Sequence, residues 1–149
     1  MSPVRAFDGI VWHMIFKGGD PRRPAAAPEG RFHHAGQTAL YTSLTVEGTV
    51  VAMQRYLRPA DPPRLVVPLT LCADRLADLR GRGDASVVWQ DSRTAGLPAP
   101  TWAFSDRARQ DGAQGMFYSS RSRPDLTHLV LFDLATITHV GEPQPAPVA

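Results

Sequence analysis

Short apolar runs, four to seven residues long, alternate along the chain with segments rich in Pro and Gly. Runs of this length bounded by turn residues predict strands, and we expect them at 11–16, 39–43, 65–71, 86–89, 115–119 and 128–132. Apolar positions at helical spacing predict helices at 46–57, 74–79 and 102–109. Because the strands and helices are short and do not form regular strand–helix units, the pattern predicts an α+β fold.

The helix expected at 46–57 has the clearest boundaries. Thr45 is a suitable N-cap, and Glu47 places a carboxylate in the first turn, where it suits the helix dipole. Pro59 ends the helical pattern. A second proline, Pro68, interrupts the apolar run 65–71, so we expect it at a sheet edge or a bulge, where no ladder hydrogen bond is lost.

The length of 149 residues and a hydrophobic content of 43% fit one domain with a buried core. Three prolines follow Glu142, so we expect a domain over 1–141 and a proline-rich tail over 142–149 that is disordered or lies on the surface. No apolar stretch approaches the roughly 20 residues of a membrane span. The run from Ile10 to Phe16 lacks the flanks of a signal peptide. We therefore expect a cytoplasmic protein that does not contact membranes.

Cysteine content and charge exclude further classes. Cys72 is the only cysteine, which excludes an intrachain disulfide and a cysteine-rich zinc site and suits a reducing cytoplasm. The net charge of +2 is too small to indicate nucleic-acid binding, and the arginines are scattered. Lys17 is the only lysine among 16 basic residues, which indicates a bacterial coding bias.

Two residues of the segment 30–57 are candidates for ligand binding. Arg31, beside a glycine, can hold a phosphate or carboxylate with two hydrogen bonds, although a surface arginine is the common alternative. Tyr41 can stack on a planar ligand, although a half-buried strand tyrosine is equally ordinary.

The remaining polar residues exclude several kinds of site. The five histidines show no ligand spacing, so we expect no metal. Ser119 and Ser120 lack a Gly-x-Ser-x-Gly elbow, which disfavours a hydrolase nucleophile and favours a hydrogen bond to a ligand. Neither a Gly-x-Gly-x-x-Gly motif nor a Walker phosphate loop is present in the sequence.

Taken in order, three segments resemble the RES-domain toxins: 30–32 (Gly-Arg-Phe), 39–43 (Ala-Leu-Tyr-Thr-Ser) leading into a helix, and 115–121 (Gly-Met-Phe-Tyr-Ser-Ser-Arg) ahead of an apolar strand. The resemblance covers residues 12–134. It implies a fold similar to ADP-ribosyltransferase toxins and a chemistry that consumes NAD+. It also implies a bacterial type II toxin–antitoxin pair with an Xre-like antitoxin, and in some members a protein that receives ADP-ribose.

By the same resemblance the family arginine matches Arg31, the tyrosine Tyr41 and the serine Ser120, with Ser119 the poorer match. Arg121 is implied as a second phosphate contact. The family glutamate, about eleven residues after the tyrosine, corresponds to Ala52. A carboxylate at this place would stabilise the oxocarbenium-like state formed when the nicotinamide–ribose bond breaks.

Three interpretations of Ala52 follow: an inactivating substitution made to express a toxic protein, a natural inactive relative, or a misplaced register. We favour the first, because alanine is the usual truncation. Glu47 is five positions away and therefore about 140° around the helix, so it does not substitute. The expected function is that of an NAD+-consuming toxin, impaired in this form, with protein, water or phosphate as acceptor. The alternative is a non-catalytic binding module that retains the pocket.

Overall fold

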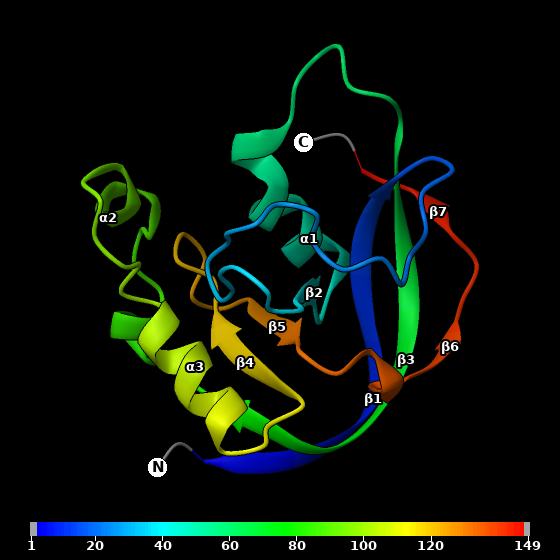
Figure 1. Cartoon of the computed structure of the whole chain (residues 1–149). Helices are drawn as coiled ribbons and strands as arrows, with labels where there is room; N and C mark the ends of the chain where they lie inside the picture. The colour runs from blue at the N-terminus through cyan, green and yellow to red at the C-terminus, as the bar shows by residue number, and fades with distance from the viewer. Residues whose placement is uncertain (1–2, 148–149) are drawn as a thin grey trace.

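Five strands form a small barrel-like sheet in a computed structural model that describes residues 3–147 (Figure 1). The order is β1-β2-β5-β4-β3, and the ring closes because β1 also pairs with β3. Neighbours are antiparallel except β3 and β4, which are parallel. The bounds are β1 Val4–Phe16, β2 Leu40–Ser43, β3 Arg64–Asp78, β4 Gly115–Ser119 and β5 Thr127–Leu131. The predicted α+β class is confirmed.

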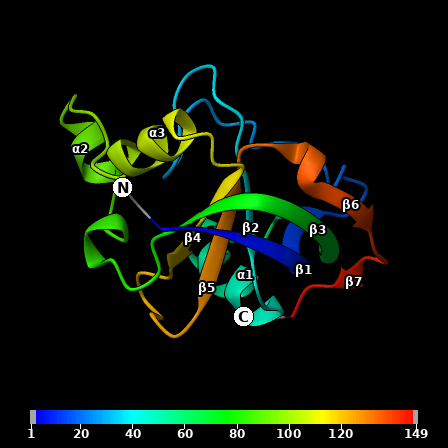
Figure 2. The same cartoon turned by 90° about the horizontal axis from the view of Figure 1, so that it is seen from below.

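The strands β1 and β3 are longer than predicted and run side by side over almost their whole lengths (Figures 1 and 2). The helix expected at 74–79 is wrong, because this segment continues β3 between β1 and β4. A bulge in β3 explains the helix-like pattern of this segment. Arg5 pairs with Leu76 and Phe7 with Ala73, so β3 has one residue more than β1 at this point and its alternation is interrupted. At the bulge the side-chain oxygen of Gln114 accepts the N–H groups of Asp74 and Arg75 at 2.8 and 3.0 Å.

Pro68 lies where its missing N–H costs nothing. Two short strands, β6 (Ile137–Val140) and β7 (Gln144–Pro145), pair with β3 on either side of it. Between them the Pro68 carbonyl accepts the N–H of Gly141 at 2.8 Å. The segment predicted as a tail therefore adds two residues, both exposed, to the sheet as β7.

Alternation along the strands creates two apolar clusters. One fills the barrel and includes Phe117 of β4 and Leu129 of β5. The other covers the outer face of β2, β5 and β4, where Met116 and Tyr118 meet α3 (Trp102–Gln110) and Phe32. Figure 1 shows α3 lying along β4 on this outer side.

The remaining helices are short: α1 (Val46–Met53), α2 (Gln90–Thr94) and the 3₁₀ turns η1 (Gln54–Tyr56), η2 (Gly83–Ala85) and η3 (Leu134–Thr136). The predicted N-cap is confirmed, because Thr45 Oγ1 accepts the N–H of Gly48 at 2.9 Å. The strand expected at 86–89 is wrong. This segment is irregular, and Ser86 donates its hydroxyl to the carbonyl of Ser119 at 2.8 Å. Among residues 3–147, no helix is long and apolar enough to cross a membrane.

Candidate functional site

The loop that carries Arg31 is fastened to α3 through its backbone carbonyls. Trp102 Nε1 donates to the carbonyl of Gly30 at 2.8 Å, and the hydroxyl of Thr101 donates to the carbonyl of Arg31. Arg109 donates to two more carbonyls, those of Phe32 at 2.8 Å and Thr38 at 2.9 Å. The backbone of Arg31 is thus held in place while its side chain is left for other contacts.

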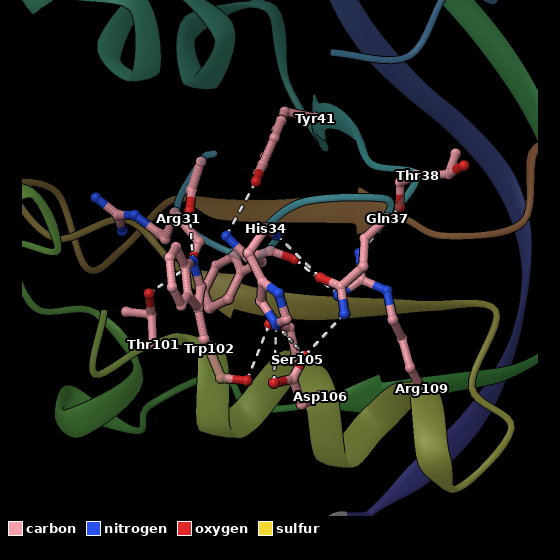
Figure 3. A network of polar contacts seen from close by, with 12 residues as sticks. Arg31, His34, Gln37, Thr38, Tyr41, Thr101, Trp102, Ser105, Asp106 and Arg109 are labelled. Carbon is pink, nitrogen blue, oxygen red and sulfur yellow. Dashed lines mark hydrogen bonds and ion pairs between the residues drawn. The ribbon is translucent and has the colours of Figure 1, made fainter. Parts of the chain in front are cut away.

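Side chains of the same loop add a second set of bonds to α3. Asp106 accepts from His34 Nε2 at 2.9 Å and from Gln37 at 2.9 Å, and the His34 ring lies 4.7 Å from the Trp102 ring. Figure 3 shows the Arg31 side chain pointing away from this network. The network therefore positions Arg31 without using its guanidinium.

Replacement of Arg109 tests the importance of this fastening. We expect Arg109→Lys to lower the free energy of unfolding by about 1–3 kcal/mol, because one ammonium cannot bridge the two carbonyls and that of Phe32 is buried. Hydrogen exchange of the amides at 30–38 should accelerate. The exposed Arg107, which pairs only with Asp111 among the residues described, is the control, and Arg107→Lys should change stability by less than about 0.5 kcal/mol. Equal exchange in both variants would contradict the expectation.

Tyr41 of β2 uses its hydroxyl within the protein. The hydroxyl accepts the N–H of Phe32 at 3.0 Å and contacts His33 Nδ1 at 2.8 Å. Burial raises the pKa of Tyr41 well above its ordinary value, so the phenol is neutral. These contacts make Tyr41 a support for the Arg31 loop.

Ser43, His128 and Tyr118 form a row across three strands next to Arg31. His128 of β5 pairs in register with Ser43 of β2 on one side and Tyr118 of β4 on the other. Ser43 Oγ lies 2.6 Å from His128 Nδ1, and the His128 and Tyr118 rings are 5.3 Å apart. By alternation the row shares the outer face of the sheet with Tyr41. All three members are nearly inaccessible, with exposures of 1%, 4% and 5%.

The guanidinium of Arg31 lies over this row. Its central carbon is 5.9 Å from the centre of the Tyr118 ring. Burial, reinforced by the Arg31 charge, lowers the pKa of His128 to about 4, so the imidazole is neutral near pH 7. Burial raises the pKa of Tyr118 to about 12, which leaves Arg31 as the charged group beside the row.

The neutral state of His128 predicts a pH dependence of stability. An unfolded histidine has a pKa near 6.5, so between about pH 6.5 and 4 only the unfolded chain binds the proton at this residue. The free energy of unfolding should therefore fall as the pH falls through this window, by about 3 kcal/mol. His13, whose pKa burial also lowers, adds to the same slope. Urea unfolding across the window should show a flatter slope for His128→Phe, and an unchanged slope would contradict the assignment.

The face of α1 that carries Ala52 turns toward the same row. A Cβ on Gly48 would come within 2.8 Å of Ser43 Cβ, so Gly48 packs directly on the row. Ala52 lies one helical turn further along this face and is exposed. Tyr56, another four residues on in η1, is close enough to Tyr118 to contribute to the raised pKa of its phenol. A side chain longer than alanine at position 52 would extend from this face.

The serines of β4 differ in their surroundings. Ser119 Oγ accepts the N–H of Gly81 at 2.9 Å, and alternation places it on the opposite face from Tyr118. Ser120, one residue beyond the strand, is buried and accepts the N–H of Arg123 at 3.3 Å, which leaves its hydroxyl hydrogen for another acceptor. Arg121 is exposed, and the structure gives its side chain no hydrogen bond within residues 3–147.

The glutamates nearest the site are already paired. Glu47 accepts from Arg123 at 3.0 Å, and Glu29 is held by two nitrogens of Arg93 at 2.9 and 2.8 Å. Neither carboxylate is placed on the Gly48–Ala52 face.

Sequence reasoning missed two members of the row and discounted the third. Ser43 could have been found, because it lies two residues after Tyr41 on the same strand face. Tyr118 lies within the motif 115–121, but an aromatic residue in an apolar strand is more often a core residue than a ligand contact. His128 gave no local signal, since its proximity to Ser43 depends on a pairing 85 residues away.

Two hollows of the described structure lie outside this site. One, of about 250 Å³, is lined by Met14, Val50 and the segments around Arg58 and Pro147. The other, of about 230 Å³, lies between Arg5, Phe7, Leu44 and Arg80. Within residues 3–147, no three His, Cys, Asp or Glu side chains are grouped so that they could hold a metal ion.

A protein-family profile matches almost the entire length of the chain. The profile of the RES domain matches residues 4–148. The chain belongs to the RES domain family. The resemblance inferred from the motifs around Arg31, Tyr41 and Ser120 is thereby confirmed at the level of the family. Among curated proteins, no sequence matches this RES domain.

A solved structure has a similar fold. The RES domain is similar to a chain in the crystal structure of the Mycobacterium tuberculosis MbcT–MbcA toxin–antitoxin complex, with a TM-score of 0.56 and 16% sequence identity. The similarity covers 97% of this chain and 84% of the mycobacterial chain. At this level of identity the comparison establishes a shared fold.

Proposed function

We propose that this RES domain is the toxin of a toxin–antitoxin pair and that it acts on NAD+ at the Arg31 site. The observation that carries the proposal is the convergence of Arg31 with the row Ser43–His128–Tyr118 beside the Gly48–Ala52 face of α1. These residues come from five elements: the Arg31 loop, β2, α1, β4 and β5. Their convergence places a charged donor and a helix face beside a nearly buried row that contains an aromatic ring, and we assign the ligand to this place.

The roles of the residues follow from their contacts. Arg31 binds a phosphate or the nicotinamide ribose, and Tyr41 holds the Arg31 loop through the N–H of Phe32. Ser120 donates its remaining hydroxyl hydrogen to the ligand, with Arg121 as an outer phosphate contact. Of the predicted binding residues, Ser119 has the weakest support, because its hydroxyl is bonded to Gly81 on the other face.

Position 52 is where the reaction requires a carboxylate. Cleavage of the nicotinamide–ribose bond develops positive charge on the ribose, and a nearby carboxylate stabilises it and orients the acceptor. The methyl group of Ala52 supplies neither effect. The proposed activity is ADP-ribose transfer to a protein, water or phosphate, impaired in this chain by Ala52.

An antitoxin is the proposed partner. The mycobacterial chain of similar fold was crystallised in a toxin–antitoxin complex. We propose an Xre-like antitoxin for this chain, acting in the bacterial cytoplasm by inserting a segment near Arg31.

Calorimetry with NAD+ tests the proposed substrate on the chain as it is, since binding does not need the carboxylate. We expect Arg31→Ala to weaken binding by about ten- to hundredfold, because hydrogen bonds to a charged group contribute roughly 1.5–3 kcal/mol. Arg107→Ala, on the exposed side of α3, is the matched control and should bind as tightly as the unmodified chain. Absence of NAD+ binding, or equal binding by both variants, would show the proposal to be wrong.

One observation favours a second candidate, a non-catalytic module that binds a nucleotide and a partner. Ala52 is exposed on α1, and neither Glu47 nor Glu29 replaces its missing carboxylate. Tight NAD+ binding without turnover in both the unmodified chain and Ala52→Glu would support this alternative.

A further inference from the structure

His128 has one ring nitrogen that the protein does not use. Its Nδ1 contacts Ser43, but its Nε2 has no hydrogen-bond partner within residues 3–147. Over the same residues, the only fully enclosed side-chain nitrogen or oxygen without a partner is Nε of Arg64. Nε2 of His128 is therefore not fully enclosed, although the residue as a whole is only 4% exposed.

The environment of Ser43 fixes which nitrogen carries the proton. Ser43 is 1% exposed, and His128 Nδ1 is the one acceptor near its hydroxyl among the residues described. A buried hydroxyl that cannot donate is costly, so Ser43 donates to Nδ1. Because His128 is neutral, its proton is then on Nε2, and this N–H has no acceptor among residues 3–147.

We propose that the Nε2–H of His128 and the guanidinium of Arg31 together form a two-donor site for a phosphate oxygen. Both groups lie near the Tyr118 ring: the His128 and Tyr118 ring centres are 5.3 Å apart, and the central carbon of the Arg31 guanidinium is 5.9 Å from the Tyr118 centre. The Arg31 charge is close enough to His128 to act on its imidazole. Since His128 remains neutral, it adds a hydrogen bond without the repulsion that a second cation beside Arg31 would cause. Ser43 is the positioning residue that keeps the donor on Nε2.

The ligand chemistry follows from these donors. A phosphate oxygen accepts from both and balances the charge of Arg31, whereas an amine or cation is repelled. The inference rests on the proposed function only in identifying this phosphate as part of NAD+. Inorganic pyrophosphate carries the same oxygens without the nucleosides, so it separates the two ideas.

Imidazole NMR on the ¹⁵N-labelled chain measures the donor directly, with NAD+ and pyrophosphate as separate probes. Before addition, His128 should show the Nε2–H tautomer. Each probe should shift its Nε2 resonance, while His139, exposed on β6, should not move. By calorimetry, His128→Phe should weaken binding about tenfold, Ser43→Ala several-fold, and His139→Gln not at all. Thermal unfolding of each variant checks that it is folded.

Each outcome decides between the two proposals. If NAD+ binds with a dependence on Arg31 but His128 neither shifts nor affects affinity, the donor site is wrong and the proposed function stands. If NAD+ fails to bind but pyrophosphate shifts His128 in an Arg31-dependent manner, the donor site stands and the NAD+ proposal falls. A proton found on Nδ1, or no response to either probe, overturns the donor site.

Discussion

Ala52→Glu is expected to raise the proposed NAD+-consuming activity by about 100-fold or more. The new carboxylate would extend from the helix face that begins at Gly48, which packs on Ser43 of the Arg31 site. Removing a group that stabilises transition-state charge commonly costs about 10²-fold or more, and restoring it should return a similar factor. The measurement is NAD+ concentration and growth in cells that express the variant, followed by turnover of the purified protein.

Ala52→Gln is the matched control for charge. It has nearly the same size as glutamate and is equally compatible with the exposed helix position, but it cannot stabilise a developing cation. We expect its activity to remain at the level of the unmodified chain. If soluble Ala52→Glu leaves NAD+ and growth unchanged, the catalytic interpretation of position 52 is wrong.

Phe32→Ala is expected to cause the largest loss of stability among the residues around Arg31. The Phe32 side chain is fully buried, with its ring centre 4.6 Å from that of Tyr118 in an edge-to-face contact. Truncation removes this packing and leaves a cavity, which typically costs about 3–5 kcal/mol. Urea unfolding should show this decrease, and NAD+ affinity should fall with it because Phe32 adjoins Arg31.

Leu97→Ala provides the comparison for an apolar residue that is not buried. Leu97 is 59% exposed, so its truncation should change the free energy of unfolding by less than about 0.5 kcal/mol. A similar small effect for Phe32→Ala would contradict the role of Phe32 in joining the Arg31 loop to β4.

Local sequence patterns predicted most helices and strands. They failed where pairing with a distant strand determines the secondary structure of a segment. The N-cap at Thr45 and the helix α3 follow from nearby residues, and both were predictable. The segment 74–79 imitated a helix, because a bulge interrupts the alternation of β3 and only its neighbours reveal it as a strand. The valines at 86–89 resemble a strand, yet no strand within residues 3–147 pairs with them.

The residues of the candidate site also fall into two groups: those that local sequence motifs indicate and those that only strand pairing brings together. Arg31, Tyr41 and position 52 were found from motifs within one short stretch of sequence. Their companions Tyr118 and His128 are adjacent only through the pairing of β2, β5 and β4, so no single segment indicates them. His128 is also buried in the folded protein, and the sequence alone does not show this burial.

The pairing of β2 with β5 has a consequence during translation. Arg31, Tyr41 and position 52 leave the ribosome early, but Ser43 meets its partner His128 only 85 residues later. The hydrogen bond from Thr101 to the carbonyl of Arg31 likewise joins residues that are 70 positions apart. Contacts so distant in sequence form slowly. During synthesis the chain would therefore contain Arg31 before Tyr118 and His128 are in place. The complete site would form in the cell only after β5 has been synthesised and has paired.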